Sequence, residues 1–407
     1  MKTSHIALAA ALSLAAGPAL AQEGCDFTTD LAIKHLSAAF PAWVAVTDTM
    51  KECAPNLVVE LDQEFRQKQP TAFAAEPSLY HIGGVANGTL TPLLNEGTIR
   101  PLDAYVEQYG QDLSPNQLIR VDGKIVAIAM MVNTQHLMYR TDVFEELGLD
   151  VPTTYAEVLD AAAKIREAGL VEYPIGATMA SGWNLAQDFV NMYAGFGGEF
   201  FDAEGNTLIT SEAGVKALET MKALTEYMDP EFLVSDSTYV QQQFQQGKIA
   251  MANLWATRAA AMDDEAESQV AGKVGMAPAP FAEEGAKPAT TIWWDGIVIA
   301  QNIPDEEAEA AFRLALEGLS PRMVAANNDD AVWLIEGYTP GPLAEGAIQT
   351  AMAGPVAYPS SVEMGLLHTA IGNNIADYLT GQESAEQSLA DTEAAYLAAA
   401  REAGLLQ

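Results

Sequence analysis

The stretch GKIVAIAMMV, residues 123–132, does most to decide the fold class of this chain. A short apolar run that is bounded by polar residues is typical of a strand buried on both faces. A membrane-spanning helix would need about 20 apolar residues, and this run, the longest apolar one after the N-terminal segment, is much shorter. We therefore predict a buried strand of an α/β protein, and we expect the mature chain to be soluble.

Helix signals follow this strand directly. Residues 142–147 are expected to form a helix that ends at Gly148, because glycine readily adopts the left-handed backbone of a helix C-cap. A second helix is expected to begin with Thr153 or Thr154 as its N-cap and with Glu157 in the capping-box position. A strand followed by helices is the pattern of layered α/β proteins.

The same alternation of short β-rich runs and amphipathic stretches continues through the rest of the chain. Strands are predicted at residues 57–61, 79–82, 248–254, 274–277 and 297–300, and helices at residues 212–227, 238–246, 305–319 and 384–403. The sequence contains no internal repeat and no low-complexity linker. We therefore expect two α/β domains that are interleaved and joined by several crossings of the chain.

The composition argues against several classes of partner. The 407 residues include 20 Lys and Arg against 55 Asp and Glu, which gives a formal net charge of −35, and 49% are hydrophobic. This is the composition of a globular protein, but it lacks the excess of cations from which a nucleic-acid-binding face is built. The same charge opposes docking on anionic lipid. Small neutral ligands are the partners that this composition favours.

The N-terminal segment, residues 1–21, is predicted to be a secretory signal peptide. Lys2 is followed by an apolar run from Ile6 to Leu20, and the small residues around Leu20 predict cleavage after Ala21. The apolar run is 15 residues long, whereas a membrane anchor needs about 20. The mature protein is therefore expected to be exported to the periplasm.

Cys25 and Cys53 are the only cysteines of the chain. In an exported protein an even pair of cysteines favours a disulfide, and two buried free thiols are the alternative. The residues before Cys25 lack the pattern of a lipoprotein signal, so we expect no lipid tether. With no CxxC motif and only five histidines, the sequence suggests neither a metal site nor a cofactor.

Four segments together resemble one protein family. They are residues 122–139, with the Asp-Gly-Lys start, the apolar strand and Asn133; residues 143–157, with Leu-Gly-Leu and Pro-Thr; residues 195–205, with paired glycines and Phe-Asp; and residues 244–251, followed by Trp255. These segments occur in the family's order and spacing. The chain thus resembles the extracellular solute-binding proteins of family 1, which serve carbohydrate ABC transporters and include maltose-binding protein.

The resemblance implies a periplasmic-binding-protein type II fold, with two α/β lobes, a hinge and a ligand cleft between the lobes. The first lobe is expected to comprise residues 22–132 and about 290–338, and the second about 133–289 and 339–407. The family closes its lobes on a ligand and presents it to permease subunits of an ABC transporter, without catalysis and without a cofactor. We expect a monomer. The segments that depart from the family pattern are residues 33–43 and 63–77.

A carbohydrate site needs flat aromatic surfaces and polar side chains that can bond hydroxyl groups. Trp255 matches the family's tryptophan position and is predicted to be a stacking platform, with core packing as the alternative. Arg258 is predicted to donate to ligand hydroxyls, or else to pair with nearby acids. Trp183 and Asn184 are predicted to reach the ligand from a loop at residues 180–184.

Trp293 and Trp294 precede a strand, and alternation in an extended chain places them on opposite faces. We expect Trp294 to face the cleft with Asp295, and Trp293 to lie in the core, where Trp43 and Trp333 are also predicted. For the two asparagines among the remaining candidates, hydrogen bonding within a turn is the alternative role. The remaining candidate ligand contacts are Asn133, Asn87, Glu64, His35, Tyr358 and Glu363.

Three functions fit these features. The leading hypothesis is a periplasmic protein that binds a neutral carbohydrate or polyol for an ABC importer. The second keeps the fold and changes the cargo to a phosphorylated or carboxylated solute, which would require a cluster of cations where the sequence offers Arg258. The third is a secreted carbohydrate-active enzyme with two catalytic carboxylates. The acidic pairs at residues 263–264 and 329–330 are more typical of solvated charge, and no catalytic motif is present.

Overall fold

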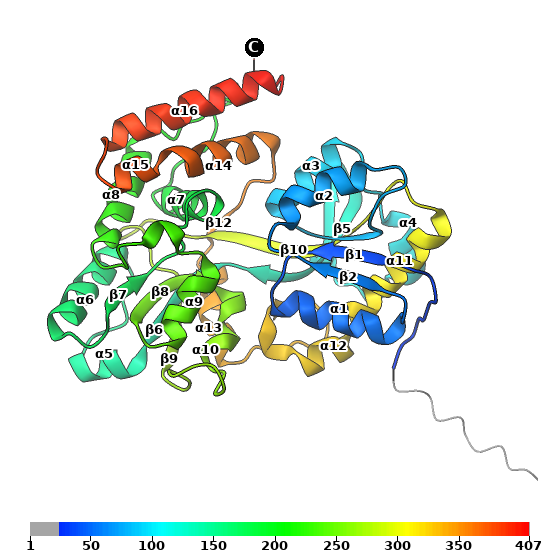
Figure 1. Ribbon diagram of the computed structural model, residues 1–407, viewed down its shortest axis with the longest axis horizontal. Helices are drawn as coiled ribbons and strands as arrows, with labels where there is room; N and C mark the ends of the chain where they lie inside the picture. The colour runs from blue at the N-terminus through cyan, green and yellow to red at the C-terminus, as the bar shows by residue number, and fades with distance from the viewer. Residues whose placement is uncertain (1–23, 407) are drawn as a thin grey trace, which may run out of the picture.

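The computed structural model describes residues 24–406 and consists of two α/β bodies side by side (Figure 1). Each body is built around its own β-sheet, so the predicted two-lobe α/β class is confirmed. The predicted signal peptide, residues 1–21, lies outside the described residues. Between residues 24 and 406 no helix combines the length and the apolar composition that crossing a membrane requires.

The sheet of the first body is mixed and has eight strands, six of them in the order β11-β5-β10-β3-β1-β2. β1 pairs in parallel with β2 and β3, whereas β10 lies antiparallel between β3 and β5. β4 pairs with β5, and β12 pairs with β10. The strands are β1 (Lys34–Ser37), β2 (Val58–Leu61), β3 (Ile82–Ala86), β4 (Leu118–Val121), β5 (Lys124–Asn133), β10 (Thr291–Ile299), β11 (Val332–Trp333) and β12 (Val356–Ala357).

Helices cover both faces of this sheet. In Figure 1, α2 and α3 lie on one side of it and α1 and α12 on the other. Trp43 and Trp333 are buried in the hydrophobic cluster of this body, as predicted. The helices are α1 (Pro41–Cys53), α2 (Phe65–Ala74), α3 (Asn87–Asn95), α4 (Asp103–Tyr109), α11 (Asp305–Gly318) and α12 (Pro321–Ala326).

The second body has a sheet of four strands in the order β7-β8-β6-β9. Its strands are β6 (Gln135–Arg140), β7 (Tyr173–Gly176), β8 (Ile249–Trp255) and β9 (Val274–Ala277). Its helices are α5 (Thr141–Leu147), α6 (Tyr155–Ala168), α7 (Trp183–Gly195), α8 (Glu212–Thr225), α9 (Ser237–Gln245), α10 (Ala259–Met262), α13 (Glu345–Met352), α14 (Val362–Asn374), α15 (Ala376–Leu379) and α16 (Ala385–Glu402). A separate hydrophobic cluster fills it.

The chain crosses between the bodies at residues 133–135, 278–290 and 334–344, and β12 afterwards pairs with the junction end of β10. The first two crossings are in contact, because the hydroxyl groups of Thr134 and Thr290 lie 3.0 Å apart. Figure 1 shows β10 leading from this junction into the first sheet. The interleaving of the two bodies therefore comes from short crossings that meet at one junction. The exact lobe limits named above stay a prediction.

The helix signals that follow β5 are confirmed. Gly148 closes α5 with a φ of 61°, in the left-handed region. Thr154 is the N-cap of α6, where its hydroxyl accepts from the backbone N–H of Glu157 at 3.3 Å. The Glu157 carboxylate accepts from the backbone N–H of Thr154 in return. These bonds satisfy donors that every helix start leaves unpaired.

Two strand predictions are wrong in position. The strand predicted at residues 79–82 is β3, which runs from Ile82 to Ala86 and includes Gly83 and Gly84 beyond the predicted end. Gly84 is required inside the strand, because a Cβ atom there would lie 2.3 Å from the Cβ of Ser37. The strand predicted at residues 297–300 begins earlier, at Thr291, because its first half pairs with β5 and β12.

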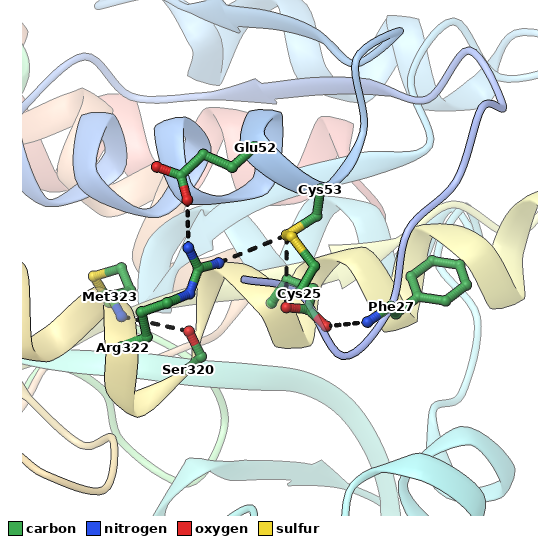
Figure 2. Close-up of a disulfide and its surroundings, with 8 residues drawn as sticks. Cys25, Phe27, Glu52, Cys53, Ser320, Arg322 and Met323 are labelled. Carbon is green, nitrogen blue, oxygen red and sulfur yellow. Dashed lines mark hydrogen bonds and ion pairs between the residues drawn. A yellow bond between two sulfur atoms is a disulfide. The ribbon is translucent and has the colours of Figure 1, made fainter. Parts of the chain in front are cut away.

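The predicted disulfide between Cys25 and Cys53 is present and ties the N-terminal segment to the end of α1 (Figure 2). Beside it, the Glu317 carboxylate of α11 accepts from the backbone N–H of Phe27 at 2.6 Å. Burial raises the pKa of Glu317. Arg322, which Figure 2 shows between Glu52 and the disulfide, donates to the Cys53 sulfur at 3.6 Å. The segment after the predicted cleavage site is therefore anchored to two helices.

We predict that the double variant Cys25→Ser/Cys53→Ser has a lower free energy of unfolding than the oxidised protein. The sequence separation of 28 residues closes a moderate loop, and the chain-entropy model gives about 3 to 4 kcal/mol for such a crosslink. Urea unfolding of the mature protein measures the difference. Adding reductant to the wild type should reproduce most of the loss, and equal midpoints for wild type and variant would contradict the prediction.

Candidate functional site

A cleft of about 750 Å³ lies between the two bodies. Aromatic, charged and neutral polar side chains line it, and they come from both bodies and from the junction. The lining residues are Ala38, Ala39, Phe40, Gln63, Glu64, Arg66, Gln67, Ala86, Asn133, Trp183, Asn184, Asp236, Ser237, Thr238, Trp255, Thr257, Arg258, Trp293, Asp295 and Thr369. The cleft is large enough for a small organic ligand, for which pockets of roughly 300 to 1,000 Å³ are typical.

Three tryptophans form one wall of the cleft. The ring centres of Trp183 and Trp293 are 5.7 Å apart in an edge-to-face arrangement, and those of Trp255 and Trp293 are 6.0 Å apart. Trp183 and Trp255 lie 6.5 Å apart with nearly parallel planes. Aromatic pairs favour these geometries. Trp183 is half-buried, whereas Trp255 and Trp293 are only 9% and 4% exposed, so Trp183 offers a ligand the most accessible aromatic surface and the other two support it.

The structure corrects the expected orientation of the paired tryptophans. Trp293 is only 4% exposed and belongs to a hydrophobic cluster, as predicted, but it also lines the cleft with Asp295. Trp294 is half-buried and packs against the hydrophobic cluster of the first body, outside the cleft lining. Strand alternation still holds in β10, and it places Trp293 and Asp295, two positions apart, on the same face. The expectation was wrong because it combined Trp294 with the next residue, Asp295, which points to the opposite face.

Trp183 reaches the cleft from the first residue of α7 and not from a loop as predicted. Gly182, directly before it, has a φ of 88° and turns the chain into the helix. Gly182 packs closely against Gly372 of α14, because a Cβ atom on Gly372 would lie 2.3 Å from the carbonyl oxygen of Gly182. Asn184, the next helical residue, also lines the cleft. The start of a helix thus holds both side chains more firmly than a loop would.

Arg258 lines the cleft, but its guanidinium group is engaged within the protein. It donates to Gln241 at 3.1 Å and, through Nη2, to the hydroxyls of Ser237 at 2.8 Å and Thr238 at 3.4 Å. Asp236 is also engaged, since its carboxylate caps α9 by accepting from the backbone N–H of Tyr239 at 2.8 Å. Arg258 therefore orients two hydroxyl groups of the cleft.

Arg66 is the cation that the sequence analysis missed. It projects from α2 of the first body, and its guanidinium carbon lies 4.6 Å above the ring of Trp183 in the second body. Its side chain remains exposed to solvent within the cleft, and within residues 24–406 no hydrogen bond to it is formed. Glu64, which precedes α2, accepts from Gln67 at 2.6 Å. Both lie in the segment that departs from the family pattern.

Asp295 lies at the base of the cleft and is only 9% exposed. Burial raises its pKa to about 7, and the positive charge of Arg66 acts in the opposite direction. None of the described residues donates a hydrogen bond to its carboxylate. Since a buried carboxylate without donors is costly, Asp295 is the cleft group that gains most from hydrogen-bond donors of a ligand.

Asn133 and Asn87 have different positions, although both were predicted to contact ligand. Asn133 lines the cleft at the end of β5, where its side-chain oxygen accepts from the backbone N–H of Thr134 at 3.1 Å. Asn87 is buried outside the cleft lining. It accepts from the backbone N–H of Trp294 at 2.9 Å and donates to the carbonyls of Ile292 and Tyr358 at 3.4 Å. Asn87 therefore joins three chain segments. The prediction that it contacts ligand is corrected, and its role is structural.

Three other candidates do not reach the cleft. His35 is fully buried in the core of the first body, where burial lowers its pKa to about 3 and its ring contacts Ser37. Tyr358 lies behind Trp293, with ring centres 4.1 Å apart, and bonds His368. Glu363 lies in the first turn of α14 outside the cleft lining. These predictions are corrected, because burial and helix direction turn the side chains away.

The sequence analysis also missed most of the neutral polar lining. Ser237 and Thr238 begin α9, and their N-cap Asp236 marks a helix start that the sequence does show. Gln63 and Gln67 flank the start of α2, for which no sequence signal was found. Among the described residues, the one group with metal-ligand spacing is Cys25, Cys53 and Glu317, whose sulfur atoms form the disulfide. The cleft itself offers hydrogen-bonding groups and aromatic surface.

We predict that Asn87→Ala lowers the free energy of unfolding by about 1 to 3 kcal/mol, because it removes a buried side chain that bonds three backbone groups, of which the Ile292 carbonyl still accepts from the backbone N–H of Tyr358. Chemical denaturation of the mature protein measures this change. Asn95→Ala, an exposed residue on the same helix, is the matched control and should change stability by less than about 0.5 kcal/mol. Equal losses in the two variants would contradict the structural role of Asn87.

Comparison with known proteins identifies the fold and the family. The structure superimposes on an ABC transporter solute-binding protein from Agrobacterium radiobacter, solved with ribitol, with a TM-score of 0.79, 24% identity and coverage of 91% of this chain and 98% of that one. The maltose-bound MalE3 protein of T. maritima gives a TM-score of 0.78, with 22% identity and coverage of 90% and 98%. These likenesses establish the type of fold, that of periplasmic binding proteins.

The matches to curated relatives cover a smaller share of each chain. A probable ABC transporter-binding protein from Deinococcus radiodurans is 26% identical over 257 residues, which are 60% of this chain and 59% of the relative. A mannitol-binding protein from Pseudomonas aeruginosa is 23% identical over 271 residues, 64% of this chain and 61% of the relative. A probable amino-acid ABC transporter periplasmic-binding protein from Sinorhizobium fredii is 27% identical over 170 residues, 40% and 38%.

The chain thus spans about two fifths to three fifths of the length of these relatives. A family profile described as bacterial extracellular solute-binding protein matches residues 46–317, which is more than half of the chain. That match includes the three tryptophans of the cleft wall, Arg66 and Asp295. The protein belongs to the family of bacterial extracellular solute-binding proteins.

Proposed function

We propose that this protein is the substrate-binding component of an ABC importer and that it captures a neutral carbohydrate or polyol in the cleft between its two bodies. The observation that carries the proposal is the wall formed by Trp183, Trp255 and Trp293, which faces neutral hydrogen-bonding side chains. Sugar C–H faces pack on aromatic rings, while hydroxyl groups need donors and acceptors around them. The cleft provides both kinds of surface.

Binding proceeds by movement of the two bodies about the three crossings. We propose that the first lobe comprises residues 22–132 with about 290–338, and the second about 133–289 with 339–407. Because the cleft is lined from both lobes, a ligand that contacts both stabilises the closed arrangement over the open one. The closed form then delivers the ligand to the permease subunits without chemical change, as a monomer in the periplasm after cleavage behind Ala21.

The known relatives support a polyhydroxylated cargo. The structural neighbour from Agrobacterium radiobacter was solved with ribitol, and one from Agrobacterium vitis, with a TM-score of 0.76 and 22% identity, carries D-mannitol. A curated relative is a mannitol-binding protein. The amino-acid transporter relative matches a smaller share of this chain. Neutral sugars and alditols are therefore the first ligands to test.

A phosphorylated or carboxylated solute is the second candidate, because the structure adds Arg66 to Arg258 in the cleft. Arg258 is already bonded to three side chains, however, and Asp236 and Asp295 add negative charge nearby. The net charge of −35 also opposes the approach of anions. A neutral cargo is therefore favoured. A carbohydrate-active enzyme is disfavoured, since the family comprises binding proteins.

We predict that a thermal-shift screen of the mature protein finds stabilisation by a narrow set of neutral sugars or alditols. Ligand at 100 times its Kd adds about 2.7 kcal/mol to the free energy of unfolding, which is a clear shift. Anionic sugars serve as the comparison. Stabilisation by anions alone would move the assignment to the second candidate, and no stabilisation by any sugar or alditol would contradict the proposed cargo.

We predict that Trp183→Ala weakens binding of the best neutral ligand from this screen at least about tenfold, because the ligand loses a stacking surface worth about 1.4 kcal/mol or more. Trp183→Phe is the matched control, since it keeps a smaller aromatic face and should retain most of the affinity. Isothermal titration calorimetry measures both. Unchanged affinity in Trp183→Ala would show that the aromatic wall is not the binding surface.

A further inference from the structure

Two charged side chains of opposite sign face the cleft with their hydrogen-bonding groups unused. Asp295 is 9% exposed, and none of the described residues donates a hydrogen bond to it. Arg66 has five N–H donors; its guanidinium lies over the rings of Phe65 and Trp183, and within residues 24–406 it forms neither a hydrogen bond nor an ion pair. Buried polar groups are normally bonded, so an unbonded buried carboxylate that lines a cleft calls for an external partner.

The other charged groups of the cleft are engaged. Arg258 donates to Gln241, Ser237 and Thr238, and Asp236 caps α9. Glu64 accepts from Gln67. Arg66 and Asp295 are therefore the charged pair in the cleft that is available to a ligand, and Arg258 acts on a ligand through the hydroxyl groups that it orients.

The positions of the two free groups relative to the aromatic wall define where a ligand would meet them. Arg66 lies over Trp183, and Asp295 shares its strand face with Trp293. The two tryptophans meet edge to face at 5.7 Å. Arg66 and Asp295 influence each other's charge without forming an ion pair. Both side chains line the cleft beside these tryptophans, where one ligand can meet them together.

We propose that Arg66 and Asp295 together act as a hydroxyl clamp, which recognises two adjacent hydroxyl groups of a neutral ligand held against Trp183 and Trp293. This assignment rests on the proposed function and specifies its substrate class as a compound with vicinal hydroxyls. One hydroxyl donates its hydrogen to the carboxylate of Asp295, and the oxygen of the next accepts from the guanidinium of Arg66. A hydroxyl group is both donor and acceptor, so a diol satisfies both charged groups at once.

The clamp also involves a change at Trp183. The guanidinium and a ligand ring cannot occupy the same face of Trp183, so binding displaces Arg66 from that face toward the rim of the ligand. Charge-assisted hydrogen bonds from the guanidinium to the ligand can offset the cation–π contact that is lost. Arg66 thus covers the platform while the cleft lacks a ligand and helps to hold the ligand afterwards.

An α-amino acid could also pair its carboxylate with Arg66 and its ammonium with Asp295. The rest of the lining decides between the two classes. Ser237, Thr238, Asn133 and Asn184 add neutral hydrogen-bonding groups around the aromatic wall, which suit a ligand with many hydroxyls better than one with two charged ends. The hydroxyl clamp is therefore favoured, and the amino acid is an explicit outcome of the test.

The test measures affinities of the mature protein by calorimetry for ribitol, D-mannitol, maltose, D-gluconate and L-glutamine. The variants are Asp295→Asn and Arg66→Gln, which remove charge with little change of shape. Asp112→Asn and Arg120→Gln, at exposed positions outside the cleft lining, are the matched controls. We expect wild type to bind at least one neutral polyol or sugar, both clamp variants to lose about tenfold or more in affinity, and both controls to match wild type.

The outcomes separate the clamp from the proposed function. If wild type and both clamp variants bind a neutral ligand equally well, the clamp is overturned and the proposed function stays intact. Binding of L-glutamine or D-gluconate alone overturns both the neutral cargo and the clamp. Binding of none of the five probes has the same consequence. Thermal unfolding of each variant confirms that it is folded, and Asp295→Asn should be at least as stable as wild type at about pH 8, since it removes a buried charge.

The pH dependence of ligand binding tests the clamp separately, because a purely structural role of Asp295 would not make the affinity depend on pH. Burial raises the pKa of Asp295 to about 7, and ligand hydroxyls that donate to the carboxylate favour its ionised form. Binding should therefore strengthen as the pH rises through 7 and be about tenfold or more weaker at about pH 5.5 than at about pH 8. Asp295→Asn should lose this dependence, and an unchanged pH profile in that variant would contradict the clamp.

Other ionisable groups near Asp295 do not produce this profile. Those that face the cleft are Glu64 and Arg66 beside α2, and Asp236 and Arg258 of the second body. Behind the wall, burial lowers the pKa of His368 to about 4 and raises that of Tyr358, so both stay neutral across the range. Burial also raises the pKa of Asp188 to about 7, but Asp188 is present in wild type and variant alike. The comparison with Asp295→Asn therefore isolates Asp295.

Discussion

The antiparallel insertion of β10 between β3 and β5 is the constraint on which the cleft depends, because one strand belongs to the first sheet and also leads to the junction of the two bodies. Its side chains alternate, so Trp293 and Asp295 line the cleft while the half-buried Trp294 packs against the hydrophobic cluster of the first body. Gly296 permits the close pairing with β5, since a Cβ atom there would lie 2.4 Å from the carbonyl oxygen of Ile128. Moving this strand would move both the hinge and the floor of the cleft.

Hydrogen-bond partners distinguish the charged residues of the cleft better than their charge does. Arg258 and Arg66 both line it, but the donors of Arg258 are taken up by side chains of its own lobe, whereas those of Arg66 face solvent. The same distinction separates Asn87, which is bonded to three backbone groups, from Asn133 at the cleft surface. A group that is already satisfied positions its neighbours, and an unsatisfied group is available to a ligand.

The strong negative charge of the protein and the neutral cargo proposed for it are physically compatible. A net charge of −35 keeps the molecule away from other anionic surfaces but exerts little force on a neutral solute. Recognition then depends on short-range contacts, namely stacking on the tryptophans and hydrogen bonds to hydroxyl groups. Charge and short-range contact both matter at Asp295, because burial makes ionisation of its carboxyl group costly unless a ligand supplies hydrogen-bond donors.

The sequence by itself determined the fold class and the boundaries of several helices, and it favoured the disulfide, because these follow from local signals. The apolar run of β5, the capping box of Thr154 and Glu157, and the single cysteine pair are each readable without the rest of the chain. Trp255 was also placed at the cleft from the resemblance to the family, and Arg258 from its position three residues later; both line the cleft.

Only the tertiary structure decided which polar groups are free. Asn87 is bonded to residues more than 200 positions away, and Arg66 meets Trp183 from the other body. Gly84 is a strand residue because Ser37 and Trp43 leave no room for a side chain. Burial and hydrogen-bond satisfaction depend on neighbours that are distant in the sequence, so no local pattern of residues can encode them.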